Sequence, residues 1–378
     1  MKEVGTVNLT FDDRRILAAR SAKNRVDPRR PFAFLVEPEL SADGTVDDVG
    51  TLFLTNRECP FRCVFCDLWK NTTDERVPVG AIPAQIDFAL ARLPAARHVK
   101  LYNSGNFFDS QAIPPEDFSS IADRVRGFRT VIVENHPKLC GDACLRFRDL
   151  LAHGAQASGG RESPEACLRA FSRGTDAPRS PDFLGTQLEI ALGLETVHPD
   201  VLPRLNKRMT VDDFDRAVEF LTANDIAVRA FVLLKPPFLA EADAVEWCLR
   251  SVEHAIAVGA RCVSIIPTRA ANGIMDALQR DGHFSPPGFA EIETAFGEAL
   301  RQTSDQWTVD SGQNLSRHRP PSTIHRPLVS SPRVFLDTWD IQRLAACLTC
   351  AAPRAERLRQ MNFTQRVLPP VACDVCRA

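Results

Sequence analysis

Three cysteines stand close together in the segment NRECPFRCVFCDLWKNT, residues 56–72. Cys59, Cys63 and Cys66 have the spacing C-x3-C-x2-C, and no fourth cysteine or histidine follows nearby. A closed zinc site needs four ligands, usually supplied as two C-x2-C pairs. Thiolates also hold iron–sulfur clusters, and a [4Fe-4S] cube with three protein ligands leaves one iron open to an outside ligand. The spacing therefore favours an open, reactive cluster. The alternative is a zinc site completed from elsewhere in the chain.

A second cysteine group lies near the end of the chain, where CLTC (347–350) and CDVC (373–376) are separated by 22 residues. This spacing is close to that of zinc sites built from two C-x2-C pairs. Four thiolates would close a tetrahedral zinc site without an open position, and a four-cysteine [4Fe-4S] cluster is the alternative. The predicted ligands of either metal are Cys347, Cys350, Cys373 and Cys376.

Apolar runs from residue 50 onward indicate the elements that must position the first cysteine group. Six segments read as strands, and helical patterns separate them: 51–55, 98–105, 129–135, 187–196, 227–235 and 261–268. Such alternation is typical of βαβ units and a parallel sheet. Six strands are fewer than the eight of a closed barrel, so we predict an α/β fold with a partial (β/α)6 TIM-like barrel. Function in such folds lies at the carboxyl ends of the strands, and the cysteine loop follows the first strand.

The remaining segments predict the domain organisation. Residues 1–49 read as a basic arm, because 11–30 carry seven Lys or Arg against three Asp. The barrel core spans 50–302, with a mobile, Gly/Ser/Pro-rich insertion at about 154–182. A flexible linker at 303–333 then leads to a small four-cysteine module at 334–378. Together with the C-terminal arginines, the basic arm could form a cationic face for RNA.

The composition indicates in which compartment the protein acts and which partners it has. The chain has 378 residues, a net charge of −2 and 44% hydrophobic residues. Charge alone therefore does not make it a polyanion binder. No stretch approaches the roughly 20 apolar residues of a membrane span, and the N-terminal residues contain no apolar leader segment. Seven of the twelve cysteines fall in the two tight groups, which suggests metal binding in a reducing compartment. We expect a cytoplasmic protein with no membrane partner.

The cysteine loop, with Phe65 directly before the third cysteine, resembles the signature of the radical S-adenosylmethionine (SAM) superfamily. The resemblance implies a radical SAM barrel whose [4Fe-4S] cluster binds the amino and carboxylate groups of SAM at the open iron. It also implies an electron donor such as flavodoxin or ferredoxin, which reduces the cluster so that SAM is cleaved to a 5′-deoxyadenosyl radical. In such enzymes the protein positions the cofactor and excludes water.

The resemblance continues at the ends of the later strands, in LYNSGNFFD (101–109), VIVENHP (131–137), LEIALGLET (188–196) and VLLKPPFL (232–239). It implies that Phe65 and several strand-end residues contact SAM: Asn103, Ser104, Gly105, Glu134 and Glu195. It also implies catalytic roles for Glu189 and Lys235.

The strand-end segments NSGNFFD, VENHP and LKPPFL together resemble the radical SAM subunit of archaeosine synthase and its bacterial relatives, and the spacing after the fourth predicted strand resembles the elongator-type branch. Three functions remain open from the sequence. The first is radical modification of a tRNA nucleobase. The second is radical chemistry on a small molecule or peptide in a biosynthetic pathway. The third is a non-catalytic binding protein organised by zinc.

Overall fold

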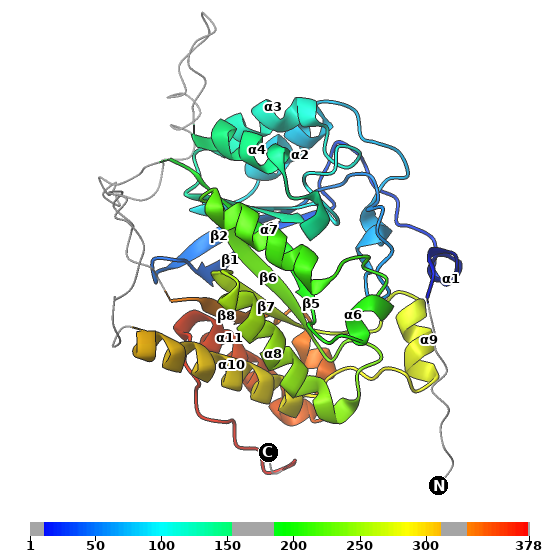
Figure 1. Ribbon diagram of the computed structural model, residues 1–378, viewed down its shortest axis with the longest axis vertical. Coiled ribbons are helices and arrows are strands. Elements are labelled where there is room, and N and C mark those ends of the chain that lie inside the picture. Colours follow the sequence, from blue (N-terminus) through cyan, green and yellow to red (C-terminus); the bar gives the residue numbers. More distant parts are fainter. Residues whose placement is uncertain (1–10, 153–184, 311–330, 377–378) are drawn as a thin grey trace, which may run out of the picture.

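The computed structural model describes residues 11–152, 185–310 and 331–376 (Figure 1). The predicted insertion at 154–182 and most of the predicted linker at 303–333 lie outside the described residues. Within these limits, the chain forms a sheet with helices packed on one of its faces (Figure 1).

The sheet has eight strands in the order β1 to β8, so each strand lies beside its neighbour in the sequence. The strands are β1 (Ala33–Leu40), β2 (Val46–Phe53), β3 (His98–Tyr102), β4 (Thr130–Asn135), β5 (Gln187–Glu195), β6 (Ala227–Leu234), β7 (Cys262–Pro267) and β8 (Arg333–Leu336). Strands β2 to β8 run parallel, and β1 pairs antiparallel with β2. The six predicted strands correspond to β2 to β7, and the predicted α/β half-barrel is confirmed.

The two end strands, β1 and β8, were not predicted. β1 lies within the predicted basic arm and contains Glu37, Pro38 and Glu39, residue types that are depleted from strands. An edge strand tolerates them because one side of it needs no backbone partner. β8 has only four residues, too few for a periodic pattern to be recognised. The predicted boundary at 49/50 falls inside β2.

The helices of the described chain are α1 (Asp13–Ala18), α2 (Ala81–Leu90), α3 (Phe118–Val125), α4 (Asp142–Ala152), α6 (Val201–Arg204), α7 (Val211–Ala223), α8 (Ala244–Ala257), α9 (Ile274–Arg280), α10 (Phe289–Asp310) and α11 (Leu348–Thr364). The hydrophobic core lies between the covering helices and every second strand residue, such as Leu52, Leu192 and Val232. Helix α7 begins with a capping box formed by Thr210 and Asp213.

The other face of the sheet turns inward, because the sheet curls until distant strands meet. Arg229 on β6 contacts Glu39 on β1 at 2.6 Å, although four strands lie between them in the sheet. The Arg333 guanidinium on β8 donates to the Leu40 carbonyl oxygen at 2.8 Å. These contacts cross the interior, and they define a half-barrel whose inner face is lined by a different set of side chains from its outer face.

The C-terminal segment is part of the barrel and not a separate body. Leu358 and Met361 of α11 are buried in the main core. The side-chain amides of Asn362 and Gln365 pair with the backbone of β8 through four hydrogen bonds of 2.8–2.9 Å. They occupy the free edge of the last strand, which would otherwise expose unpaired backbone groups. The helix therefore has packing partners of its own, without any metal.

Within the described residues, no helix is long and apolar enough to cross a membrane.

Candidate functional site

The cysteine loop follows β2 and lies at the carboxyl ends of the parallel strands. Its backbone is held from two distant elements. Val64 N–H donates to the Leu205 carbonyl oxygen at 2.9 Å, just after α6. The Asn272 side-chain amide, just before α9, donates to the carbonyl oxygens of Val64 at 2.6 Å and Cys66 at 3.0 Å. Because all three hydrogen bonds involve backbone atoms of the loop, its conformation depends on elements more than 100 residues away in the sequence.

The N-terminal segment covers the outside of this loop. Ile16 of α1 packs in one cluster with Val64. Glu58 forms ion pairs with Arg20 and Lys23, both at 2.7 Å, and with Arg62 at 3.0 Å. Glu58 of the cysteine loop therefore neutralises part of the positive charge of the predicted basic arm. This weakens the expectation that the arm forms a free cationic face for RNA.

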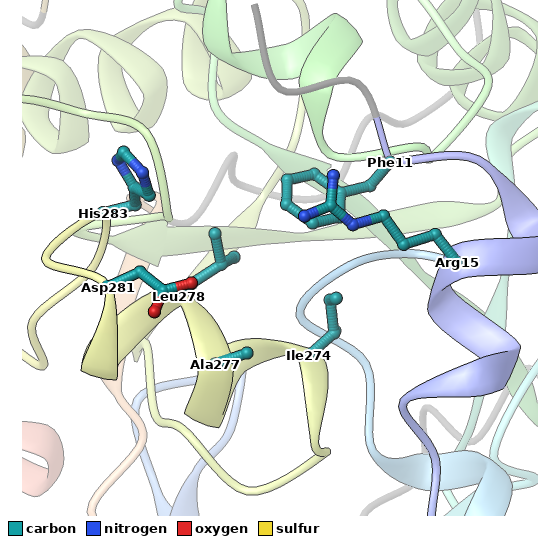
Figure 2. A pocket seen from close by; sticks show the side chains of 7 residues that line it. All are labelled: Phe11, Arg15, Ile274, Ala277, Leu278, Asp281 and His283. Carbon is teal, nitrogen blue, oxygen red and sulfur yellow. The ribbon is translucent and has the colours of Figure 1, made fainter. Parts of the chain in front are cut away.

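A small pocket lies between α1 and α9 on the same side of the molecule (Figure 2). Its volume is about 130 Å³, which is below the roughly 300–1,000 Å³ of typical ligand sites. Phe11 and Arg15 form one wall, and Ile274 and Leu278 form the floor, with His283 opposite. The pocket belongs to the packing of the N-terminal segment over α9, and it is too small for a cofactor the size of SAM.

The three thiols of the loop lie in surroundings that favour their neutral form while no metal is bound. Burial raises the pKa values of Cys59 and Cys63, and it raises that of Cys66 to about 12. The Asn106 amide donates to Cys59 Sγ at 3.2 Å. A side chain at Gly105 would place its Cβ 3.2 Å from that of Cys59. Metal ligands must be thiolates, so metal binding at this loop would release protons.

Glu134 and Asn103 form a second part of the site, at the ends of β4 and β3. A Glu134 carboxylate oxygen accepts hydrogen bonds from the backbone N–H groups of Asn103 at 2.6 Å and Gly105 at 3.3 Å. Burial nevertheless raises the pKa of Glu134 to about 7. The Asn103 side chain is fully buried, yet neither its nitrogen nor its oxygen has a partner in the described chain. Buried amides are rarely left unpaired, so this amide indicates a place for a polar ligand.

A buried ion pair stands beside the thiols. Lys207 Nζ lies 2.5 Å from a Glu195 carboxylate oxygen, and both side chains are buried. Burial lowers the pKa of Lys207, but the Glu195 carboxylate outweighs it, so the net shift is upward. The thiols of Cys63 and Cys59 raise it further. Lys207 was not predicted from the sequence, because it lies in a loop whose pattern does not show that it reaches the cysteines.

A ring stack connects Lys207 to the cysteine loop. Phe61 lies flat on His136, with centroids 3.8 Å apart and planes 5° apart. His136 Nε2 is 3.0 Å from the Lys207 carbonyl oxygen. Burial lowers the pKa of His136 to about 3, so this imidazole is neutral and can stack. The stack therefore joins the loop, the end of β4 and the Lys207 segment.

The other predicted residues differ in where they lie. Ser104, Glu195 and Lys235 all have left-handed backbone conformations, with φ of 53°, 66° and 59°, and all three directly end or follow strands. Such strained positions cluster at functional sites. Lys235 pairs with Glu291 at 3.1 Å, on the side of α10. Phe65 is half-buried between the clusters around Ile274 and Leu205.

Glu189 does not lie at this site, contrary to the prediction. It is near the start of β5, at the opposite end of the strand from Glu195. Its carboxylate contacts Arg229 at 2.6 Å and Arg333 at 3.6 Å in the barrel interior. Position along a strand decides which end of the barrel a side chain occupies, and Glu195 stands six positions after Glu189 on the same strand. Its contacts are those of a structural ion pair.

The four C-terminal cysteines come together as predicted. Their sulfur atoms all lie within 4.8 Å of one another, with 3.9 Å between Cys347 and Cys373 and 3.6 Å between Cys350 and Cys376. Cys347 and Cys350 stand at the start of α11, and the other two cysteines come from the C-terminal tail. A metal here would fasten the tail to the helix.

Several known proteins are similar to this chain, although no protein-family model matches it. The sequence is 26% identical to archaeosine synthase subunit beta of Methanosarcina acetivorans over 311 residues, which is 80% of this chain and 74% of that one. Coproporphyrinogen III oxidase (HemN) from Escherichia coli is 12% identical with a TM-score of 0.38, over 83% of this chain and 60% of that one. The archaeal Methanocaldococcus infernus Elp3 is 12% identical with a TM-score of 0.41, over 74% and 58%. The chain thus spans less than two thirds of both solved chains.

The half-barrel and the three-cysteine loop at its strand ends are the features that the resemblance to radical SAM enzymes predicts. The chain resembles archaeosine synthase subunit beta over most of its length, so the predicted resemblance is confirmed.

Proposed function

We propose that the chain holds a [4Fe-4S] cluster on Cys59, Cys63 and Cys66 and uses it to cleave SAM reductively. When bound, the cluster supplies the electron that produces a 5′-deoxyadenosyl radical from SAM. The proposal is carried by one observation: three partly buried thiols stand beside a buried, unpaired amide at the carboxyl ends of parallel strands. A three-cysteine cluster needs an outside ligand, and the Asn103 amide is available to bind one.

The surrounding residues have separate roles in this proposal. The Asn103 amide and the Glu134 carboxyl group bind polar groups of SAM, and Ser104 and Gly105 shape the turn beside them. The Lys207 ammonium, held by Glu195, offsets the negative charge of the thiolates. Ile16 and the other apolar residues of α1 and α9 exclude water from the outer side of the loop. A flavodoxin or ferredoxin would supply the electron.

The C-terminal cysteines bind a single zinc ion in this proposal, and not a second cluster. A tetrahedral ion with Zn–S bonds of about 2.3 Å places its sulfur ligands about 3.8 Å apart. The measured separations of 3.9 and 3.6 Å match this value. The thiolates of a cubane bind four different iron atoms and must stand farther apart. The geometry therefore supports a closed, structural zinc site.

One experiment tests both metal assignments. We expect the variant in which Cys59, Cys63 and Cys66 are all alanine, reconstituted without oxygen, to lose its iron and sulfide and to release no 5′-deoxyadenosine, while retaining one zinc per chain. The control is Cys248→Ala, because Cys248 is buried in α8 outside both groups and should leave both metals in place. Residual iron and sulfide in the triple variant would refute the zinc assignment. Unchanged 5′-deoxyadenosine release would refute the radical mechanism.

We further propose that the substrate is a tRNA nucleobase, on the basis of the named relative, archaeosine synthase subunit beta. Binding of tRNA should then weaken steeply with salt, because phosphate contacts release counterions. Fluorescence anisotropy with labelled tRNA at increasing salt measures this slope. An absence of binding, or a flat slope, would favour the small-molecule or peptide alternative. The ion pairs of Arg20 and Lys23 with Glu58 and the net charge of −2 speak for that alternative.

A further inference from the structure

A cluster of ion-paired side chains closes one end of the half-barrel interior. Arg229 contacts Glu39 and Glu189, each at 2.6 Å, and Lys100 contacts Glu39 at 2.5 Å. These residues lie toward the starts of β3, β5 and β6 and near the end of the antiparallel β1. All are buried or nearly so. They form a floor that separates the interior from the end of the barrel opposite the cysteine loop.

Above this floor, the inner face is open. Phe53, Tyr102, Glu134, Phe231 and Ile266, on five different strands, all retain partial exposure to solvent. Their immediate neighbours on the outer face are fully buried: Leu52, Leu101, Val133, Val232 and Ile265. Side chains in the middle of a helix-covered sheet stay accessible only if the space in front of them is unfilled. The accessible space therefore lies inside the half-barrel, between the floor and the cysteine loop.

Three of the five residues that line this space are aromatic. The Tyr102 ring stands edge-on to Phe231, with centroids 6.4 Å apart and an interplanar angle of 87°. It stands at 66° to Phe53, also at 6.4 Å. Tyr102 is the single tyrosine of the chain, and its hydroxyl has no hydrogen-bond partner among the described residues. Burial raises the pKa of Tyr102 to about 12, so the hydroxyl keeps its proton and can donate it.

We propose that Phe53, Tyr102 and Phe231 form a subsite for a planar, conjugated ring of the substrate, whose edge hydrogen-bonds to the Tyr102 hydroxyl. This proposal rests on the proposed function, because the subsite faces the loop where the radical would form. Aromatic side chains bind flat rings by stacking and edge-to-face contact. An aliphatic chain would gain only the burial of its apolar surface, whereas a flat ring can also contact a face of one ring and an edge of another.

Ring binding can be measured without any radical chemistry. The probes are 2-aminopurine, whose fluorescence is quenched by stacking, and indole, each titrated into the reconstituted holoprotein. We expect saturable binding of at least one probe and about tenfold weaker binding in Phe231→Leu, which is the loss expected for one aromatic contact. Tyr102→Phe should retain the stacking and lose affinity for the probe whose edge bonds to the hydroxyl. The probe that binds more tightly distinguishes a purine-like ring from an indole-like ring.

The matched control is Phe88→Leu. Phe88 is also partly buried and edge-on to another ring, Phe34, with centroids 6.0 Å apart, but it lies on α2 outside the barrel. The Phe88→Leu substitution should leave the affinity for both probes unchanged. If Phe231→Leu does not fold, Phe231→Met serves instead, because the flexible methionine side chain adapts to an irregular space. Failure of both probes to bind the wild type, or equal affinity in the Phe231 variants, would overturn the subsite. SAM binding is measured in parallel, so failure of the proposed function appears separately, as a wild type that does not bind SAM.

Discussion

Gly193→Ala should destabilise the protein and reduce iron binding at the proposed cluster site. An added Cβ at residue 193 would lie 2.1 Å from a Glu195 carboxylate oxygen and 2.4 Å from Lys207 Nζ. Both atoms are the ends of flexible side chains, but these side chains are buried, so the pair would have to shift or separate inside a packed site. Complete loss of one partner of a buried pair costs about 3–5 kcal/mol, which is the upper limit of the expected effect. Displaced Lys207 would also leave the thiolate charge without its compensating cation. We expect a lower free energy of unfolding in denaturant and a reduced iron content after reconstitution.

The control for this prediction is Gly127→Ala, where an added Cβ meets no atom within 4 Å and little effect is expected. A sharper test introduces Gly193→Ala into a Lys207→Met, Glu195→Gln background. There the buried pair is already absent, so the alanine should cost much less than in the wild type. Equal costs in the two backgrounds would show that the ion pair is not the reason Gly193 is needed.

The second substitution with a large expected effect is Arg229→Met, which should lower the free energy of unfolding without acting on the cysteine loop. Arg229 is almost completely buried and holds the carboxylates of Glu39 and Glu189. Its removal leaves two buried carboxylates, of which Glu39 keeps Lys100. Loss of one partner of a buried pair costs about 3–5 kcal/mol. Urea unfolding of the purified variant measures this loss.

The stability deficit of Arg229→Met should change with pH in a defined direction. In the wild type, burial raises the pKa values of Glu39 and Glu189, but the neighbouring cations together outweigh it and hold both pKa values below their usual range: Arg229 beside both carboxylates, Lys100 beside Glu39 and Arg333 beside Glu189. Their contribution to stability is therefore present above the unfolded-state pKa and is lost as the pH falls through the lower folded-state values. Without Arg229, Lys100 and Arg333 remain, but the pKa values of both carboxyl groups rise, so the folded variant binds protons more readily than the folded wild type. The stability deficit of Arg229→Met should thus shrink as the pH is lowered from about 8 to about 5.

Arg124→Met is the matched control for Arg229→Met. Arg124 also contacts a carboxylate, that of Asp87, through two hydrogen bonds of 2.7 and 2.8 Å, but that pair is exposed. Exposed ion pairs contribute about 0–1 kcal/mol. If the two variants lost similar stability, burial would not be the source of the effect at Arg229. A deficit that is constant with pH would contradict the assigned roles of the two carboxylates.

Much of the fold could be predicted from local sequence patterns. The strands β2 to β7 are short apolar runs between amphipathic helices, and such periodicity is visible without a structure. The edge strands were missed because β1 contains charged residues and proline and β8 has only four residues. Residues such as Glu37 and Glu39 look like solvent-exposed surface in the sequence. In the structure, Glu39 is part of the floor of the barrel, because the curled sheet brings β1 opposite β6.

The functional site, too, could be predicted only in part from the sequence. The four C-terminal cysteines were predicted as one metal site, and their convergence is confirmed. Glu189 and Glu195 are two carboxylates on one strand. Because they lie at opposite ends of that strand, Glu189 forms a structural ion pair in the barrel interior and Glu195 lies beside the thiols. Lys207 reaches the cysteine loop from a loop after α6, and no spacing rule connects it to residues 59–66. Its role depends on Gly193, whose missing side chain leaves room for the ion pair.

The sequence by itself determined which metal ligands the chain offers, because thiol count and spacing are local properties: three cysteines lie in one short loop, and two close pairs lie near the C-terminus. Only the tertiary structure decided what surrounds that chemistry. The charged floor, the aromatic interior and the Lys207–Glu195 pair are assembled from strands and loops that are distant in the chain. Their energies depend on burial, and burial is set by the curling of the whole sheet.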